Sequence, residues 1–248
     1  MAISSIACMV TSTSDVVAKC TPMPQNESGA ARRCKVMLVD DHPMFREYLG
    51  QLINGAMGMS VCGEADNNRD AMKLIKETRP DIAIVDITLR GSSGLELLKD
   101  IKAEGIKLNM LVLSMHDEEL YAERALRAGA RGYITKNEAS SEVINAIRKV
   151  MAGEAYVSKR ITSQLLQRVA AQKKGESTLG GMVTLADREL EVFQMLGRGK
   201  SPAEIAQLLH LGESTVETYR GRIKEKLGLR SAADLYLRAG QWVRENGG

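Results

Sequence analysis

The sequence predicts a doubly wound α/β domain built on a five-stranded parallel sheet, followed by a small all-α domain. From Lys35 onward, short apolar runs alternate with stretches of helical periodicity, the pattern of βαβ units around a parallel sheet. From Thr184 to Ala239 only helical periods remain, broken by short turns. A polar stretch from Gln172 to Gly181, which contains Lys-Lys-Gly and Gly-Gly, separates the two patterns and is typical of a linker.

Five apolar runs are the predicted strands, because strands covered on both faces of a parallel sheet are short and continuously apolar. A helical stretch follows each of them, and the third helix is expected to start at a capping box formed by Ser93 and Glu96. The predicted strands are Val36–Val39, Met59–Cys62, Ile82–Val85, Met110–Leu113 and Gly132–Ile134. The predicted helices are Met44–Ile53, Arg69–Glu77, Leu95–Ala103, Glu118–Ala128 and Ser141–Met151, with a further helical piece at Ile161–Ala171.

We expect four segments along the 248 residues. Residues 1–34 are rich in Ser, Thr and Ala and contain a Thr-Pro-Met-Pro breaker, so they are predicted to form a disordered extension. An organelle transit peptide is the weaker alternative, because arginines are few and no amphipathic period is visible. Then follow the α/β domain at residues 35–157, a linker with a helix at 158–181, and the all-α domain at 182–248.

The composition is that of an ordinary globular protein, with 44% hydrophobic and 26% charged residues and a formal net charge of +3. So small a net charge does not by itself indicate a nucleic-acid partner. No apolar run approaches the ~18 residues that span a bilayer, and no secretion signal is visible, so we expect a cytoplasmic protein. The four cysteines, Cys8, Cys20, Cys34 and Cys62, lack CxxC spacing and are expected to be reduced, without disulfide or zinc roles.

Polar side chains follow the predicted strands at the points where the strands end. Asp40 and Asp41 follow the first strand, Asp86 follows the third, Ser114 ends the fourth and Lys136 follows the fifth. In a doubly wound sheet, ligands bind beyond the carboxyl ends of the strands. We therefore expect these five side chains to form one site.

Three carboxylates at one sheet edge repel each other unless a cation neutralises part of their charge. Oxygen ligands favour Mg²⁺, which keeps open positions for phosphoryl oxygens. One carboxylate could then attack phosphorus, while Lys136 binds one phosphoryl oxygen and Ser114 donates a hydrogen bond to another. Taken alone, each residue has an ordinary structural explanation: Asp86 as a helix cap or turn residue, Lys136 as a solvated charge and Tyr133 as a strand aromatic. The prediction of a phosphoryl site therefore depends on the whole set.

Four motifs, LVDDHP, IVDITLRG, VLSMHDE and GYITK, resemble the receiver domain of two-component response regulators. The resemblance covers Lys35 to about Val157 and implies a flavodoxin-like fold. It implies that Asp86 is the phosphoacceptor and that Asp41 is a direct ligand of Mg²⁺. Asp40 is implied to lie near the ion or to bind it through a water molecule. The implied metal set is thus Asp40, Asp41, Asp86 and the backbone carbonyl of Thr88, and the implied phosphoryl-binding and switch residues are Ser114, Tyr133 and Lys136.

One departure from the family pattern is visible next to Asp86. Leu89-Arg90 stands where the family usually has Met-Pro, which puts the rigidity of this loop and the rate of dephosphorylation in question. Thr88 and His116 flank the site in the family and are expected to tune the same rate. His42, which precedes Pro43, is read as a helix-start residue rather than a ligand.

The all-α domain carries two helix-start signals a short distance apart. Ser201 to Glu204 and Ser214 to Glu217 each read as a capping box, and Leu208 to Gly212 leaves room only for a tight turn between the two helices. Small Ala206 permits a close crossing of those helices. This is the geometry of a helix-turn-helix.

The second of these helices has an apolar stripe, which leaves its other face for DNA. Residues Val216, Tyr219, Ile223 and Leu227 form the stripe, so the exposed face presents Glu217, Thr218, Gly221 and Glu225, flanked by Arg220, Arg222 and Lys224. Of the ten Lys and Arg residues in 182–248, five lie between Arg220 and Arg230. Such local positive charge suits contacts with phosphates.

The segment from Leu185 to Ala239 resembles the LuxR-type helix-turn-helix domain, which together with the receiver motifs indicates the NarL/FixJ family of response regulators. The resemblance implies DNA binding to paired half-sites and a dimer contact in the last helix. Glu217 could accept a hydrogen bond from a cytosine amino group or serve its own capping box. The implied DNA-binding set is Ser214, Thr215, Glu217, Thr218, Arg220, Gly221, Arg222 and Lys224, and the implied dimer set is Leu235, Tyr236 and Ala239, for which simple core packing is the alternative.

The resulting hypothesis is a phosphorylation-controlled, DNA-binding transcriptional regulator. A sensor histidine kinase would phosphorylate Asp86 in the presence of Mg²⁺, and the protein would dimerise on promoter DNA without being an enzyme in any other reaction. One alternative is a phosphatase that works through an aspartyl-phosphate, although a DxD nucleophile motif is absent. The other is a regulator whose first domain binds a small effector or flavin and is never phosphorylated.

Overall fold

The structure, a computed structural model, describes residues 32–115, 118–159, 161–163 and 184–246. The described residues from Arg33 onward form one compact unit. Almost all of the predicted extension, and most of the predicted helix at Ile161–Ala171, lie outside the described residues.

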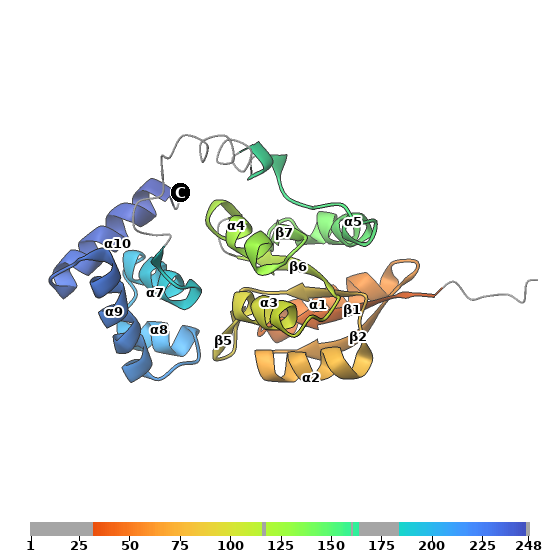
Figure 1. Cartoon of the computed structure of the whole chain (residues 1–248), viewed down its shortest axis with the longest axis horizontal. Coiled ribbons are helices and arrows are strands. Elements are labelled where there is room, and N and C mark those ends of the chain that lie inside the picture. Colours follow the sequence, from red (N-terminus) through yellow and green to blue (C-terminus); the bar gives the residue numbers. More distant parts are fainter. Residues whose placement is uncertain (1–31, 116–117, 160, 164–183, 247–248) are drawn as a thin grey trace, which may run out of the picture. The chain divides into compact units, whose positions relative to one another are not determined.

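The first domain is built on a parallel sheet of five strands in the order β2-β1-β3-β6-β7 (Figure 1). Each predicted strand is present, usually with one to three more residues at its ends. The doubly wound order confirms the predicted fold class. The strands are β1 (Cys34–Val39), β2 (Met59–Ala65), β3 (Ile82–Val85), β6 (Asn109–Ser114) and β7 (Gly132–Thr135).

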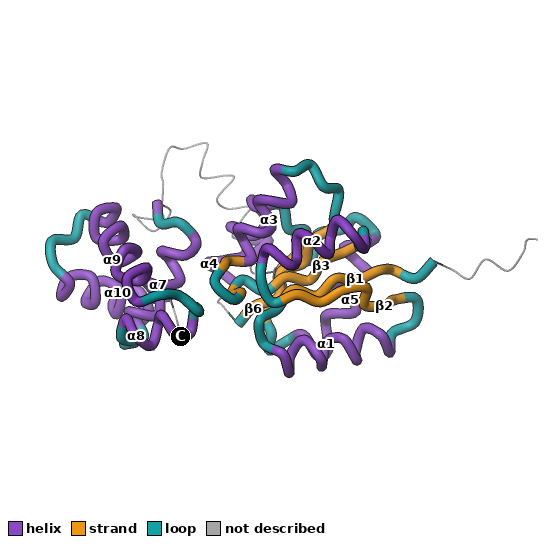
Figure 2. The backbone as a smooth tube through the Cα atoms, turned by 90° about the horizontal axis from the view of Figure 1, so that it is seen from below, coloured by secondary structure: helices purple, strands orange, loops and turns teal. Residues whose placement is uncertain are grey.

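Helices cover both faces of this sheet, as Figure 2 shows. The side chains of β1 alternate between two apolar clusters: Val36 and Leu38 pack with residues of two helices, and Met37 and Val39 pack with residues of the other three. The first pair is α1 (Pro43–Gly55) and α5 (Ala139–Met151), and the other three are α2 (Asn68–Thr78), α3 (Gly94–Ala103) and α4 (Glu118–Ala128). The core of this domain therefore lies in two layers, one on each side of the sheet.

A short hairpin that the apolar pattern does not predict lies between β3 and α3. Its strands, β4 (Thr88–Leu89) and β5 (Ser92–Ser93), pair antiparallel around Gly91, which has a φ of +67°. Strands of two residues are too short for an alternating pattern to show in a sequence. The backbone N–H of Arg90 donates to the carbonyl of Asp66 at 3.0 Å, a bond that the family's usual proline cannot make.

The second domain contains helices α7 (Asp187–Gly197), α8 (Pro202–Leu208), α9 (Glu213–Leu227) and α10 (Ala232–Asn246). The capping boxes predicted at Ser93 and at Ser201 are both formed. Val216 and Ile223 of the predicted stripe are fully buried. The predicted all-α domain with a helix-turn-helix at α8 and α9 is thus present.

The second capping box of this domain is not formed, and that prediction was wrong. Helix α9 begins at Glu213 after Gly212 and has no side-chain cap, so Ser214 lies inside the first turn. The preceding turn explains the shift: His210 has a φ of 52°, and Leu211 donates from its backbone N–H to the carbonyl of Ala206 at 2.8 Å. This is a Schellman arrangement, which ends α8 sharply, and α9 then begins two residues earlier than the capping box at Ser214 predicted.

Candidate functional site

The acidic residues that follow β1 and β3 meet a lysine that follows β7. Lys136 Nζ lies 2.7 Å from Asp40 Oδ2 and 2.6 Å from Asp86 Oδ2. The side chains of all three residues are at most 5% exposed. The tertiary structure therefore brings together the residues that the strand ends predicted.

The backbone fixes these side chains through bonds between neighbouring strands. Asp86 donates from its N–H to the carbonyl of Val39 at 2.8 Å, and Lys136 does the same to the carbonyl of Ser114. Gly94 packs against the Asp86 peptide so closely that a Cβ there would lie 1.8 Å from the Asp86 carbonyl oxygen. The sheet register and this glycine together hold Asp86 in place.

The charges in the pocket shift each other's protonation. Burial, opposed by nearby Lys136, raises the pKa of Asp86 to about 6. Burial also raises the pKa of Asp41. For Lys136, burial lowers the pKa, but attraction to Asp86 and Asp40 outweighs burial and raises it. The pocket thus holds more acidic groups than its single lysine neutralises, which suits a further cation.

The remaining predicted residues, Ser114, Tyr133 and Thr88, belong to strands β6, β7 and β4. Ser114 is fully buried at the end of β6, and the ring of Tyr133 in β7 is only 1% exposed. Thr88 starts β4, two residues after Asp86, and is half-buried. Tyr133 is thus a buried residue of the apolar core.

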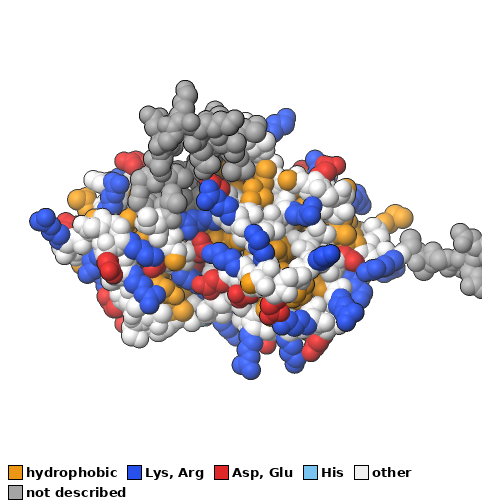
Figure 3. All heavy atoms as spheres, in the orientation of Figure 1, with side chains coloured by type: hydrophobic (Ala, Val, Ile, Leu, Met, Phe, Trp, Pro, Cys, Tyr) orange, Lys and Arg blue, Asp and Glu red, His pale blue; other side chains and the backbone are white. Residues whose placement is uncertain are grey.

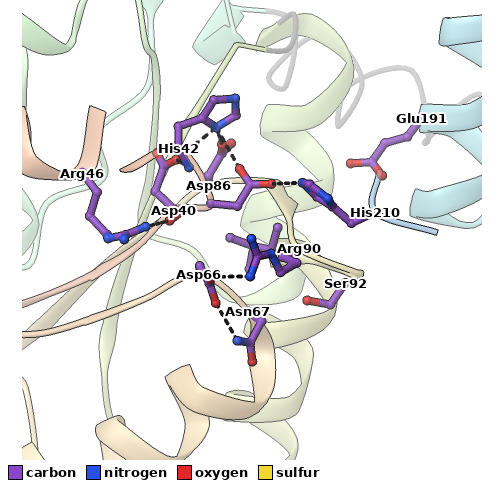
Figure 4. A network of polar contacts seen from close by, with 12 residues as sticks. Asp40, His42, Arg46, Asp66, Asn67, Asp86, Arg90, Ser92, Glu191 and His210 are labelled. Carbon is purple, nitrogen blue, oxygen red and sulfur yellow. Dashed lines mark hydrogen bonds and ion pairs between the residues drawn. The ribbon is translucent and has the colours of Figure 1, made fainter. Parts of the chain in front are cut away.

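Two residues near the pocket were not predicted as part of it. His42 precedes α1, as expected, but its Nδ1 also lies 2.8 Å from Asp41 Oδ1 and 3.2 Å from Asp40 Oδ1 (Figure 4). Arg46, one turn into α1, donates to the backbone carbonyl of Asp40 and to Glu64. The sequence feature that could have indicated both residues is their position one to six residues after Asp40 and Asp41.

One oxygen or nitrogen atom from each of Asp40, Asp41, His42 and Asp86 lies within 4.8 Å of the others. Three of these four are carboxylates, the donors that Mg²⁺ prefers. The donor set therefore fits a hard divalent cation.

Several polar contacts join the second domain to the first. Asp187 of α7 pairs with Lys99 of α3 at 2.6 Å and with Arg124 of α4 at 2.9 Å. Next to it, Arg188 donates to the carbonyls of Leu89 and Ser92 in the β4–β5 hairpin. The β4–β5 hairpin, which contains Leu89 and Arg90, is therefore a contact surface for α7.

Two more groups from the second domain lie on the side of the acidic pocket. His210, in the turn of the helix-turn-helix, has its Nε2 3.9 Å from Asp41 Oδ2 (Figure 4). Glu191 of α7 is fully buried and pairs with Arg188. Burial, opposed by Arg188, raises the pKa of Glu191 to about 7. The acidic pocket is thus in contact with the domain it is expected to control.

The predicted DNA-facing residues of α9 differ in their exposure. Glu217, Thr218, Gly221 and Arg222 are exposed, as is Ser214, whereas Thr215 and Lys224 are half-buried. Lysine, arginine and acidic side chains are interspersed over the face of the molecule in Figure 3, in keeping with the small net charge. The exposed part of the predicted DNA-binding set lies on one helix.

Arg220 does not have the place expected for a phosphate contact. Its side chain is only 14% exposed, it pairs with Glu217, and its guanidinium lies 5.5 Å from the ring centroid of Tyr236 in α10. Arg220 turns toward α10 because that aromatic ring and the Glu217 carboxylate both attract its charge.

The predicted dimer residues are also differently placed. Leu235 and Ala239 are fully buried in the core of their own domain, and Tyr236 is half-buried beneath Arg220. A Cβ on Gly197 of α7 would lie 2.4 Å from the Ala239 carbonyl oxygen, so the α7 and α10 backbones are in close contact. For Leu235 and Ala239 the structure therefore favours core packing, the alternative that periodicity left open, over the expected dimer contact.

The remaining sequence-based expectations concern cysteines and membranes. Cys34 and Cys62, the two cysteines among the described residues, are free thiols. No helix in the described parts of the chain is both long and apolar enough to cross a membrane.

The fold and the paired domains define a class of protein, the two-component response regulators. Residues 36–148 match the response regulator receiver domain, and residues 183–239 match the bacterial regulatory proteins of the luxR family. The chain belongs to the NarL/FixJ type of response regulators, which combine these two domains, and it is a transcriptional regulator of two-component systems.

Individual proteins resemble this chain over most of its length. The virulence-factor transcription regulator BvgA of Bordetella pertussis is 36% identical over 201 residues, which are 81% of this chain and 94% of BvgA. A LuxR-family response regulator of Aurantimonas has a crystal structure 35% identical, with a TM-score of 0.52, covering 56% of this chain and 99% of that one. A structure of RcsB of Salmonella enterica serovar Typhimurium, bound to a promoter in the presence of a phosphomimetic, shares the fold at 20% identity with a TM-score of 0.54. The match covers 84% of this chain and 98% of the RcsB chain.

Proposed function

We propose that this regulator is switched by phosphorylation of Asp86 and that the switch controls its binding to promoter DNA. The observation that supports the proposal most directly is the buried group of Asp40, Asp86 and Lys136, with Asp41 beside it. Carboxylates held this close together, with one lysine, form a site for a dianionic phosphoryl group and a cation.

In the proposed reaction, one carboxylate oxygen of Asp86 attacks the phosphorus of a phosphorylated histidine in a sensor kinase. A P–O bond to Asp86 forms, the P–N bond of the donor breaks, and the histidine nitrogen keeps the electron pair. Lys136 moves from the Asp86 carboxylate to a phosphoryl oxygen, and the hydroxyl of Ser114 donates to another. Tyr133, which is buried in β7, is proposed to be the aromatic residue that changes position on phosphorylation.

The resident cation of the site is proposed to be Mg²⁺. Asp40, Asp41 and Asp86 would hold it with the carbonyl of Thr88, and it supplies charge that offsets repulsion between the carboxylates and the phosphoryl group. His42 is a less suitable ligand for this hard cation, and we assign it to the start of α1 and to the acidic pair.

The second domain is proposed to bind double-stranded DNA through α9. Thr218, Gly221 and Glu217 would face base edges in the major groove, and exposed Arg222 would contact phosphate. A homodimer would read two half-sites, with the dimer contact on the exposed side of α10, where Leu237 is 60% exposed. Because its partner is promoter DNA, we propose that the protein acts in the cytoplasm.

The two domains are proposed to be coupled by a population shift. The contacts of Asp187, Arg188 and His210 with the first domain favour a closed arrangement. Phosphorylation needs to change the balance by only a few kcal/mol to make the open form dominant, since about 1.4 kcal/mol changes an equilibrium tenfold.

The proposal is tested by phosphorylating the purified protein with Mg²⁺ and a small phosphodonor. Intact mass, DNA affinity and oligomeric state are then compared between wild type and Asp86→Asn. We expect a single stoichiometric label and a gain in DNA affinity only in wild type. Asp100→Asn, an exposed acid on α3, is the matched control and should behave as wild type.

Each other outcome points to one of the alternatives. Repeated release of phosphate from the donor, rather than one label per chain, would indicate a phosphatase. DNA binding that is equal in wild type and Asp86→Asn, with or without the donor, would show that phosphorylation of Asp86 does not control the regulator.

A further inference from the structure

We propose that Arg220 is a positioning residue that holds Glu217 as the reader of a cytosine in each half-site. This inference rests on the proposed DNA-binding function and adds a base preference to it. The structural basis is the trio of Glu217 and Arg220 on α9 and Tyr236 on α10.

Glu217 has no structural task that would occupy its carboxylate at the start of the helix. Because α9 begins at Glu213, Glu217 is the fifth helical residue and lies beyond reach of a cap. Its side chain is 55% exposed, and its one described partner is Arg220. An acidic side chain on the face expected to approach DNA is costly unless a cation neutralises it, because the phosphates repel it.

Arg220 supplies that cation from the protein side. Three residues further along α9, its side chain is 14% exposed and stacks over the Tyr236 ring. The guanidinium is therefore fixed against α10, which limits the rotamers of Glu217 and leaves the outer part of its carboxylate free. An arginine in this position orients an acceptor instead of contacting a phosphate.

The neighbours of Glu217 leave the base edges accessible. Thr218 donates its hydroxyl to the carbonyl of Ser214 at 2.9 Å, so its proton is already used within the helix. Gly221, one turn after Glu217, has no side chain, and a Cβ there would have no atom within 4 Å, so the space on that side of Glu217 is open. The carboxylate of Glu217 is thus an acceptor that Arg220 holds in place on the exposed face of α9.

A fixed carboxylate discriminates among base pairs in the major groove. It needs a donor, and the groove offers the cytosine N4 amino group or the adenine N6 amino group. The adenine amino group lies between two acceptors, N7 of adenine and O4 of thymine, which repel a carboxylate. The cytosine amino group has an acceptor on one side only, so the carboxylate favours cytosine.

The experiment uses the full chain activated with Mg²⁺ and beryllofluoride. A preferred duplex is first selected from a randomised library, and affinities are then measured for that duplex and for versions in which one base pair is replaced. Variants Glu217→Gln, Arg220→Met and Arg220→Lys are compared with Glu225→Gln, an exposed acid later on the same helix.

We expect wild type to prefer C·G at one position of each half-site by about tenfold. Glu217→Gln should lose that preference and shift it toward adenine, which a glutamine amide can bind through N6 and N7. Arg220→Met should lose the same preference, Arg220→Lys should keep part of it, and Glu225→Gln should keep all of it.

The salt dependence separates positioning from phosphate contact. Arg220→Met should leave the slope of log affinity against log salt unchanged, while Arg222→Ala should reduce it by about 0.9. The inference is overturned if Glu217→Gln keeps the wild-type base preference, or if Arg220→Met weakens all duplexes equally with a reduced slope. Failure of wild type to prefer any duplex over random DNA would instead refute the proposed DNA-binding function.

Discussion

Gly94 lies against the acidic pocket so closely that even the smallest side chain at this position would meet the Asp86 backbone. It begins α3 directly beside the peptide of Asp86, and its missing side chain permits that contact. The same segment carries Ser93, whose capping box fixes the start of the helix. The position of Asp86 therefore depends on a neighbouring glycine, which has no side chain to take part in a reaction.

We predict that Gly94→Ala destabilises the first domain by about 1–3 kcal/mol, because the new methyl group forces the Asp86 peptide to move. Denaturant unfolding followed by far-ultraviolet circular dichroism measures the loss. Gly55→Ala, at the end of α1, is the matched control: its Cβ would meet nothing within 4 Å. The control should be neutral or up to ~1 kcal/mol more stable. Equal stability of the two variants would contradict the packing argument.

At the scale of elements, α9 combines a regular apolar stripe with an exposed glycine in its interior. Val216 and Ile223 anchor the helix in the core, whereas Gly221 faces solvent and has no packing neighbour. A glycine inside a helix costs about 1 kcal/mol relative to alanine. Since no packing contact among the described residues requires this glycine, we infer that it serves the proposed approach of DNA to the helix.

We predict that Gly221→Ala raises the stability of the second domain by about 0.5–1 kcal/mol and lowers its affinity for the preferred duplex. Thermal unfolding and DNA titration of the same sample measure both effects. Gly228→Ala is the contrasting variant, because Gly228 ends α9 with a φ of +65° and alanine there is strained. That variant should be less stable than wild type. An unchanged DNA affinity for Gly221→Ala would remove the proposed reason for the glycine.

At the scale of the whole molecule, the contacts between α7 and the first domain are the means by which one domain can influence the other. They depend on charged residues far apart in the sequence, such as Arg124 and Asp187. Arg124 also donates to the carbonyl of Leu185. Charge-assisted bonds of this kind contribute about 1.5–3 kcal/mol each when partly buried.

We predict that Arg124→Met increases the DNA affinity of the unphosphorylated protein at least about tenfold, because the closed arrangement loses two bonds and the loss of one already corresponds to about tenfold. The substitution leaves the DNA-binding domain itself unchanged, so a titration with duplex DNA isolates the effect of the contact. Arg127→Met, on the same helix, removes only the ion pair with Glu123 inside the first domain. This control should leave DNA affinity as it is. If Arg124→Met behaves the same way, the contact does not restrain the DNA-binding domain.

The sequence by itself determined the two folds and the three residues that meet in the acidic pocket. Apolar runs with period and length suited to buried strands fixed the sheet, and Asp40, Asp86 and Lys136 were found because parallel strands end at one common edge. Capping signals at Ser93 and Ser201 also held, since such caps depend on residues only three apart. These features are local, or follow from a topology with few possible forms.

Only the tertiary structure decided which neighbour each exposed or charged side chain meets. Periodicity showed that one face of α10 is apolar, but packing against α7 determined that Leu235 and Ala239 are core residues. Likewise, a basic residue such as Arg220 was expected at the phosphates until the Tyr236 ring was seen beneath it. The physical reason is that burial and ion pairing depend on residues distant in the chain, which the residue pattern within one helix does not identify.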